Sequence, residues 1–173
     1  MGKGTVYFFT GLAGAGKTTI GGLFYRRLQA IKPNAVLIDG DKNRDKSNAR
    51  APRDYSTEAR RQGAKNLLMQ CKGLAEQGLD AVYCGIGMYA DVRAWCRENI
   101  ENYREIYIKV SMETLRRRNQ KGLYSPGMKQ VVGVDLPWDE PDSSDVVIEN
   151  DREENPEIIV DRLFKAFGLE DGV

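Results

Sequence analysis

The sequence predicts an α/β fold in which five parallel strands form one sheet between two layers of helices. Short apolar runs of three to six residues recur along the chain, and longer segments with apolar residues spaced three and four apart lie between them. The short runs are typical of strands buried on both faces, and the longer segments of helices with one buried side. Their regular alternation indicates βαβ units and therefore a parallel sheet with helices on both faces.

The first predicted strand, residues 6–10, runs into the segment GLAGAGKT at residues 11–18. This segment fits the phosphate-binding pattern G-x-x-x-x-G-K-[ST], and residues 19–28 behind it have helical spacing. The glycines let successive N–H groups point at one phosphate chain, and the helix N-terminus adds its positive dipole end. Lys17 can reach the β- and γ-phosphates, and the Thr18 hydroxyl can hold Mg²⁺. The sequence therefore predicts a P-loop NTPase fold that binds a nucleoside triphosphate.

The other elements follow from the same patterns. Strands are predicted at residues 35–38, 81–86, 106–110 and 146–148. Helices are predicted from Ser56 or Thr57 to Gly78, over residues 91–99 and 113–118, and after the cap signature Asn155-Pro156. Residues 119–141 are rich in proline and glycine, which predicts a long loop or a mobile lid.

Charged side chains gather where the second strand ends. The carboxyl ends of parallel strands meet at one edge of a sheet, and ligands bind there. Asp39 and Asp41 end this strand, and the basic segment at residues 42–61 follows. Phosphoryl transfer needs a carboxylate near the acceptor, and arginine grips anionic oxygens in pairs. We therefore expect Arg44 and Arg60 to contact an anionic acceptor, whereas Asp41 serves as a base or as a metal anchor.

Composition narrows the class of protein. The chain has 173 residues, which suits a single domain over residues 1–173, and its net charge of +1 disfavours broad nucleic-acid binding. No apolar run approaches the length of a membrane span, and no signal peptide is evident. The three cysteines and the absence of histidine disfavour the common zinc sites and a disulfide framework, so we expect a cytoplasmic protein. A general base must then be a carboxylate, a lysine or a tyrosine.

Several segments together resemble the adenylylsulfate kinase family. In chain order they are GLAGAGKTTI from residue 11, LIDGDKNR at residues 37–44, Tyr55-Ser56 with Arg60, Tyr89 with Arg93, Arg118 with KGLY at residues 121–124, and VGVDLPW at residues 132–138. The resemblance implies a P-loop kinase domain, usually a homodimer. It also implies ATP and Mg²⁺ as cofactors and transfer of the γ-phosphate to the ribose 3′-hydroxyl of a small nucleotide acceptor, adenylylsulfate.

The resemblance assigns roles position by position. The catalytic residues would be Lys17, Asp41 and Lys121, with Thr18 and Asp41 at the metal. The residues that bind ATP would be Gly11, Ala13, Gly14, Ala15, Gly16, Lys17, Thr18, Thr19, Arg118 and Val132. The residues that bind the acceptor would be Asp39, Asp41, Arg44, Tyr55, Arg60, Ile86, Tyr89, Lys121 and Leu123. Within this scheme, Arg118 and the segment at residues 132–137 would lie over the adenine of ATP.

The departures from the family pattern lie mostly on the acceptor side. A family serine, phosphorylated in some members, falls on Gly87, which rules out a phosphoenzyme at that position, and a nucleotide-contacting asparagine falls on Gly63. Two alternatives therefore stay open. The first is a kinase that phosphorylates cytidine diphosphoramidate, because the chain also resembles kinases of the same superfamily that are found with capsule-sugar pathways and act on this compound. The second is a P-loop binding module without a transfer step, although no Asp-x-x-Gly element of the signalling GTPases is present.

Overall fold

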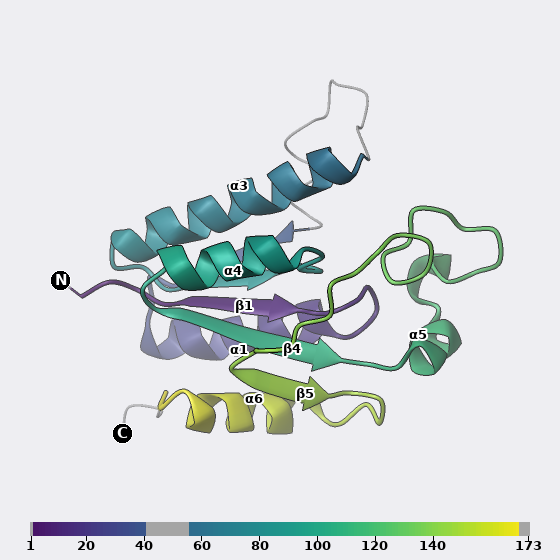
Figure 1. Cartoon of the computed structure of the whole chain (residues 1–173). Coiled ribbons are helices and arrows are strands. Elements are labelled where there is room, and N and C mark those ends of the chain that lie inside the picture. Colours follow the sequence, from purple (N-terminus) through teal and green to yellow (C-terminus); the bar gives the residue numbers. More distant parts are fainter. Residues whose placement is uncertain (1, 41–55, 170–173) are drawn as a thin grey trace.

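A computed structural model describes residues 2–40 and 56–169, and the strands in these ranges form one five-stranded sheet (Figure 1). The strands are β1 (Val6–Thr10), β2 (Val36–Asp39), β3 (Ala81–Cys84), β4 (Tyr103–Lys109) and β5 (Val146–Glu149). Their order in the sheet is β2-β3-β1-β4-β5, and every neighbouring pair is parallel. The strand that precedes the phosphate-binding segment is therefore the central one.

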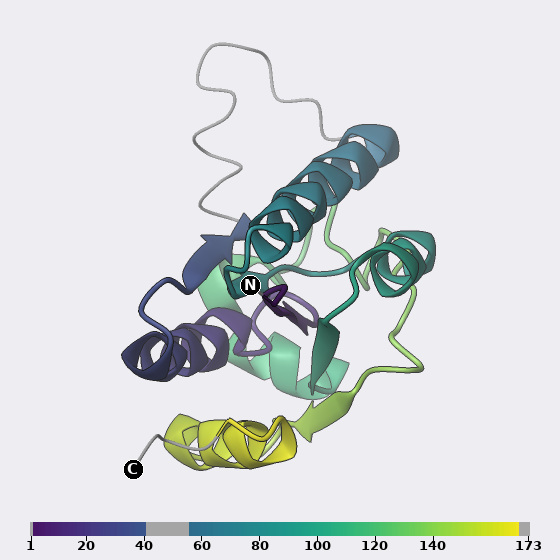
Figure 2. The ribbon, with the colours of Figure 1, turned by 90° about the vertical axis from the view of Figure 1, so that its left-hand side faces the viewer.

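Helices cover both faces of this sheet (Figure 2). They are α1 (Lys17–Ile31), α3 (Thr57–Glu76), α4 (Ala90–Asn99), α5 (Met112–Arg118) and α6 (Pro156–Ala166), with a short 3-10 turn at Gln120–Gly122. Helices α1 and α6 pack together on one face, and α3 and α4 pack on the other. The predicted three-layer fold is confirmed.

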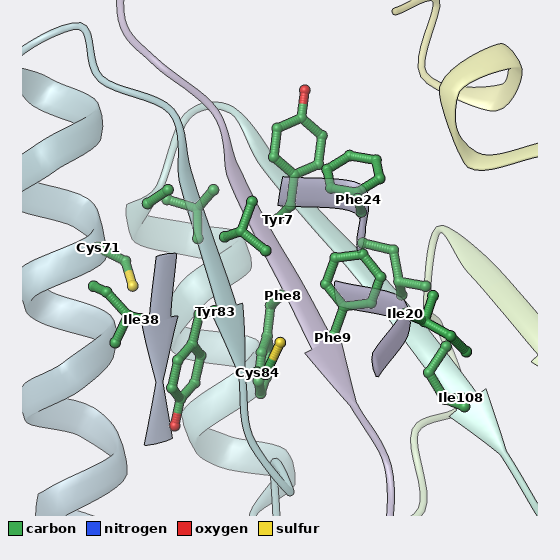
Figure 3. Packing of buried hydrophobic residues seen from close by; sticks show 14 of the residues in the cluster. Tyr7, Phe8, Phe9, Ile20, Phe24, Ile38, Cys71, Tyr83, Cys84 and Ile108 are labelled. Atoms are coloured by element: carbon green, nitrogen blue, oxygen red, sulfur yellow. The ribbon is translucent and has the colours of Figure 1, made fainter. Parts of the chain in front are cut away.

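The core is built on the alternating side chains of β1 (Figure 3). Tyr7 and Phe9 point to one face, where their rings lie 5.0 and 5.3 Å from the Phe24 ring of α1. Phe8 points to the other face and stacks on Tyr83 of β3 at 4.9 Å. Burying a side chain of this size stabilises the fold by about 1.5–3 kcal/mol. Because β1 is buried on both faces, the loop that follows it starts from a fixed point.

Two of the predicted helix starts are confirmed by their caps. The Ser56 hydroxyl accepts a hydrogen bond from the N–H of Ala59 at 3.2 Å, and α3 begins at the next residue. The Asn155 side chain accepts from the N–H of Glu157 at 3.0 Å, with proline at the first helical position of α6. Both side chains satisfy amides that the helix itself leaves unpaired.

The structure differs from the prediction in three details. Strand β3 ends at Cys84, two residues early, because a turn at Gly87 (φ +66°) follows. Strand β4 begins at Tyr103, three residues early, since its polar start pairs with β1. On α4 a charged residue, Arg93, is buried beside Val92, while Trp95 packs half-buried against the core. The Arg93 guanidinium is satisfied by two backbone carbonyls, which the hydrophobic pattern cannot reveal.

Candidate active site

The phosphate loop, residues 11–16, lies at the carboxyl end of β1, and α1 begins directly behind it at Lys17 (Figure 1). Two of its glycines are required by geometry. Gly11 has φ +148°, and a Cβ there would stand 2.5 Å from the carbonyl oxygen of Ile108. Gly16 has φ +108°, and a Cβ would stand 2.9 Å from Nδ2 of Asn150. Residues with a side chain rarely adopt such conformations, so the loop needs glycine at both positions.

Side chains from four places hold the carbonyl groups of this loop. The donors are Lys17 Nζ to the oxygen of Leu12 (2.9 Å), the Tyr124 hydroxyl to Ala13 (2.5 Å), Arg118 Nη1 to Gly14 (3.2 Å) and Asn150 Nδ2 to Ala15 (2.9 Å). Bonds to four successive carbonyl groups fix the shape of the loop, as an anion site built from backbone amides requires.

The start of α1 completes the anion site. Thr18 and Thr19 lie exposed in its first turn, where the backbone amides have no partner within the helix. Lys17 is half-buried, and its ammonium lies 2.9 Å from the oxygen of Leu12 at the start of the same loop. The loop thus combines amides, a helix N-terminus and a cation.

A cavity of about 450 Å³ opens beside the loop. Three segments far apart in the sequence surround it: the phosphate loop with the start of α1, the ends of β2 and β3 with the start of α3, and the predicted lid. Its lining residues are Ala13, Gly14, Gly16, Lys17, Thr18, Thr19, Asp39, Arg60, Ile86, Gln120, Lys121, Leu123, Gln130, Val131 and Val132. Residues predicted for the donor side and residues predicted for the acceptor side therefore share one cavity.

The wall opposite the phosphate loop carries both charges. Asp39 ends β2 and pairs with Cys84 of β3. Arg60 lies in the first turn of α3, where its N–H donates to the oxygen of Ser56, and its Nη2 lies 3.5 Å from the oxygen of Gln130. This wall therefore offers a carboxylate and a guanidinium to the cavity.

Ile86 and Tyr89 follow β3, but only Ile86 lines the cavity. The Ile86 oxygen accepts hydrogen bonds from the Thr10 hydroxyl at 2.7 Å and from the N–H of Gly11 at 3.3 Å. The Tyr89 ring is buried, and its hydroxyl donates to the oxygen of Thr57 at 2.9 Å. Burial raises the pKa of Tyr89 above its ordinary value. These contacts give Tyr89 a packing role that holds the start of α3 near the cavity.

The residue between them, Gly87, cannot carry a side chain. Its φ of +66° is unfavourable for other residues, and a Cβ would stand 2.3 Å from the hydroxyl oxygen of Thr10. The Thr10 side chain of β1 therefore occupies the space that a side chain at residue 87, the position of the family serine, would need.

Arg118 borders a second hollow, of about 380 Å³, on the other side of the phosphate loop. Its guanidinium donates to the oxygens of Gly14 and Asn150 and pairs with Glu153 at 2.9 Å. The segment at residues 133–137 lines a third cavity, of about 620 Å³, beyond the end of β4. Arg118 and this segment therefore do not lie over one common cavity, although the resemblance implied that both cover the adenine.

Most of the predicted site residues come together, with clear exceptions. Gly11 and Ala15 shape the loop from its buried side, and Tyr89 and Arg118 lie outside the 450 Å³ cavity. Three predicted residues, Asp41, Arg44 and Tyr55, lie outside the described residues.

The sequence prediction missed Gln120, Gln130 and Asn150. Asn150 follows β5 at the ligand-binding edge, so the rule on strand ends could have found it. No sequence signal pointed to Gln130, which lies in the lid with φ +61°.

Residues 2–40 and 56–169 contain no group of three or more His, Cys, Asp or Glu side chains placed to hold a metal ion. Within the same ranges, no helix combines the length and the apolar character needed to cross a membrane.

Comparison with known proteins gives the family. The family model for adenylylsulphate kinase matches residues 3–149. The cytidine diphosphoramidate kinase of Campylobacter jejuni is 35% identical over 168 residues, 95% of this chain and 96% of that protein. The probable adenylyl-sulfate kinase of Archaeoglobus fulgidus is 29% identical over 151 residues, 85% of this chain and 96% of that protein.

A solved structure is similar along nearly the whole chain. The APS kinase of Mycobacterium tuberculosis, in complex with AMPPNP and APS, has a TM-score of 0.85 and 23% identity, covering 97% of this chain and 99% of that one. At this identity the likeness establishes the fold. The sequence matches establish the rest: the chain belongs to the adenylylsulphate kinase family and is an ATP-dependent kinase that acts on a nucleotide.

Proposed function

We propose that the chain transfers the γ-phosphate of ATP to the ribose 3′-hydroxyl of cytidine diphosphoramidate. The observation that carries the transfer step is the 450 Å³ cavity, in which the phosphate loop and Lys17 lie opposite Asp39, Arg60 and Lys121. Phosphoryl transfer depends mainly on positioning and on neutralising charge. A phosphate cradle that faces a carboxylate and two cations supplies both.

On the donor side, the loop amides and the first turn of α1 bind the triphosphate. Lys17 leaves the oxygen of Leu12 and moves to the β- and γ-phosphates. The hollow at Arg118 takes the base, because it opens from the same loop and offers a flat guanidinium for stacking. The Arg118 guanidinium is held by three contacts and therefore offers a fixed surface on which the base can stack.

The site fits Mg²⁺ as the metal. Magnesium keeps several waters and is bound through one or two protein oxygens plus substrate phosphates, so a cluster of carboxylates is not needed. The exposed Thr18 hydroxyl lines the cavity at the start of α1 and can hold the ion, and Asp41 is the second proposed ligand. When bound, Mg²⁺ neutralises charge on the β- and γ-phosphates.

On the acceptor side, Arg60 and Lys121 bind the anionic bridge of the nucleotide, with Arg44, Tyr55 and Leu123 as further proposed contacts. The 3′-oxygen forms a bond to the γ-phosphorus, and the bond from that phosphorus to the β–γ bridging oxygen breaks. ADP leaves, and the hydroxyl proton passes to a carboxylate. We assign this carboxylate to Asp41, because the chain has no histidine.

Two findings support cytidine diphosphoramidate as the acceptor. The relative with that name is 35% identical along almost the full length of both chains. The departures from the adenylylsulfate kinase pattern, including Gly63 and Gly87, lie on the acceptor side. Adenylylsulfate is the second candidate, supported by the family model and by relatives such as that of Archaeoglobus fulgidus.

A coupled assay of ADP release with each acceptor tests the proposal. We expect turnover with cytidine diphosphoramidate at a kcat/KM at least about tenfold higher than with adenylylsulfate. The reverse preference would replace the acceptor and keep the reaction. If neither acceptor gave turnover while ADP still bound, the chain would be a binding module. Asp41→Asn serves as the matched control, because it should abolish turnover and retain ADP binding.

We also propose a homodimer with one kinase domain per chain, which the family resemblance supports. The cysteine content and the net charge support a cytoplasmic location and no nucleic acid as partner. Sedimentation equilibrium over a range of protein concentrations tests the dimer. A single species at the mass of one chain would contradict it.

A further inference from the structure

We infer that Tyr124 is a positioning residue, which holds Lys121 at the transfer site by anchoring a turn of the lid to the phosphate loop. The inference rests on the proposed phosphotransfer, in which Lys121 contacts the acceptor or the transferred phosphate. Nothing in the local sequence requires such a role, because Tyr124 is separated from its partner Ala13 by 111 positions.

The first observation is the conformation of Lys121. Its φ is +56°, in the left-handed region that residues with side chains rarely adopt outside asparagine and aspartate. Its ammonium group makes no hydrogen bond or ion pair with any residue in the described ranges, and the residue lines the 450 Å³ cavity. Strained residues of this kind persist only when their surroundings enforce the conformation, and they cluster at functional sites.

The second observation is the turn that enforces it. Asn119 begins the turn at residues 119–125 with φ +38°, and its side chain bonds to two residues at the other end of that turn. Its Oδ1 accepts from the N–H of Tyr124 at 2.9 Å, and its Nδ2 donates to the Ser125 hydroxyl at 2.9 Å. Backbone bonds from Gly122 to the oxygen of Asn119 (2.9 Å) and from Ser125 to the oxygen of Gly122 (3.2 Å) complete it. These bonds tie residues 119–125 into one closed turn.

The third observation is the anchor. The Tyr124 hydroxyl donates to the oxygen of Ala13 at 2.5 Å, within the phosphate loop. The Tyr124 side chain is half-buried, and burial raises the pKa of its hydroxyl, which therefore remains a donor at neutral pH. At the start of the turn, Arg118 donates to the oxygen of Gly14 at 3.2 Å, and the Tyr124 bond holds the far end of the turn, beyond Lys121, to the same loop. Removing the Tyr124 hydroxyl leaves Lys121 chemically intact and releases that far end.

The test replaces Tyr124 with phenylalanine, which removes only the hydroxyl. The matched control is Tyr25→Phe, because the Tyr25 hydroxyl accepts a hydrogen bond from Gln29 within α1. We expect Tyr124→Phe to lower kcat at saturating substrates about fivefold to tenfold, the range for one hydrogen bond. ADP affinity should change less than about twofold, since Ala13 is only half-buried and water can replace the lost donor to its oxygen. Tyr25→Phe should leave both quantities unchanged.

A double-mutant cycle with Lys121→Ala shows whether Tyr124 acts by positioning Lys121 or by stabilising the phosphate loop in general. If Tyr124 acts through Lys121, the loss of kcat disappears when Lys121 is already alanine. An unchanged kcat in Tyr124→Phe would overturn the inference, and so would a loss of equal size in the Lys121→Ala background.

Hydrogen exchange tests the anchor without any turnover. Tyr124→Phe should raise the exchange rates of the amides of residues 122–125 about fivefold or more, whereas Tyr25→Phe should not. Unchanged exchange would refute the anchor even in an active enzyme. Raised exchange in a chain that phosphorylates neither acceptor would uphold the anchor and refute the proposed function.

Discussion

Replacing Asn150 by alanine should weaken both the fold and the phosphate loop. Asn150 is 7% exposed, and its Nδ2 donates to the oxygen of Ala15, a residue with no exposed surface. In the variant this carbonyl loses its donor in a place that water does not reach. A buried acceptor left without a partner costs about 1–3 kcal/mol.

Part of this cost is offset. The Oδ1 of Asn150 is buried and has no hydrogen-bond partner among the described residues, so its removal relieves an existing desolvation cost. We therefore expect the free energy of unfolding to fall by about 1.5 kcal/mol, in the lower half of the range for a lost partner. For a chain of this length, that loss lowers Tm by about 3–6 °C.

Urea unfolding followed by circular dichroism measures the stability, and calorimetric titration with ADP measures the loop. The slope of the unfolding free energy against urea should stay constant, because the fold is unchanged. ADP affinity should fall about fivefold, since the fully buried oxygen of Ala15 loses a donor that water cannot replace.

Two variants control this experiment. Asn102→Ala removes a side chain whose Nδ2 makes longer bonds, 3.3 and 3.4 Å, to the chain near the N-terminus, and should cost less than about 0.5 kcal/mol. Asn150→Asp keeps the size but directs a carboxylate at the Ala15 oxygen, so it should cost more than alanine. If Asn150→Ala matched Asn102→Ala in stability and bound ADP like the original chain, the loop would not depend on Asn150.

Three further predictions concern the same edge of the sheet. Lys17→Ala should reduce kcat/KM by about 10²–10³, the loss expected for one preorganised charge contact, and near-normal steady-state kinetics would contradict its role. Gly87→Ala should lower the unfolding free energy by at least about 2 kcal/mol from strain and overlap with Thr10. Gly127→Ala is the control, because Gly127 has a similar φ of +85° but open space around it, and it should cost only about 1 kcal/mol. Equal urea midpoints for the two variants would refute the predicted overlap between residue 87 and Thr10. Hydrogen bonds from Ser111 lower the pKa of Asp151 from its ordinary value of 3.8 to about 2. The ionised carboxylate therefore stabilises the fold fully above about pH 3.8, and this stabilisation is lost as the pH falls toward 2. Asp151→Asn should remove this acid-limb dependence in urea midpoints measured from pH 2 to pH 5.

The sequence was sufficient for the order and type of the elements. The buried strands and amphipathic helices differ in the period of their apolar residues, which is a local property. The phosphate loop was readable for the same reason, because Gly11, Gly16 and Lys17 act within one turn of the chain. Element ends were less accurate: β3 stops short of Gly87, whose φ is +66°, and β4 extends through a polar start that pairs with β1.

Arg93 shows where pattern fails. A charged residue on the inner side of α4 contradicts a hydrophobic stripe, yet Arg93 is buried beside Val92. The structure buries Arg93 because its guanidinium donates to the carbonyl oxygens of Gly87 and Asp139, which come from two different loops. A buried charge is tolerated only when such partners satisfy it, and no local signal announces them.

By itself the sequence determined the α/β fold, the phosphate loop and the kind of chemistry, because each depends on residues close together in the chain. The tertiary structure decided which side chains support that loop. Tyr124 and Asn150 reach its carbonyl oxygens across 111 and 135 positions, and neither has a neighbouring residue that would predict the contact. Hydrogen bonds between distant segments depend on how the strands are ordered in the sheet, and that order exists only once the chain has folded.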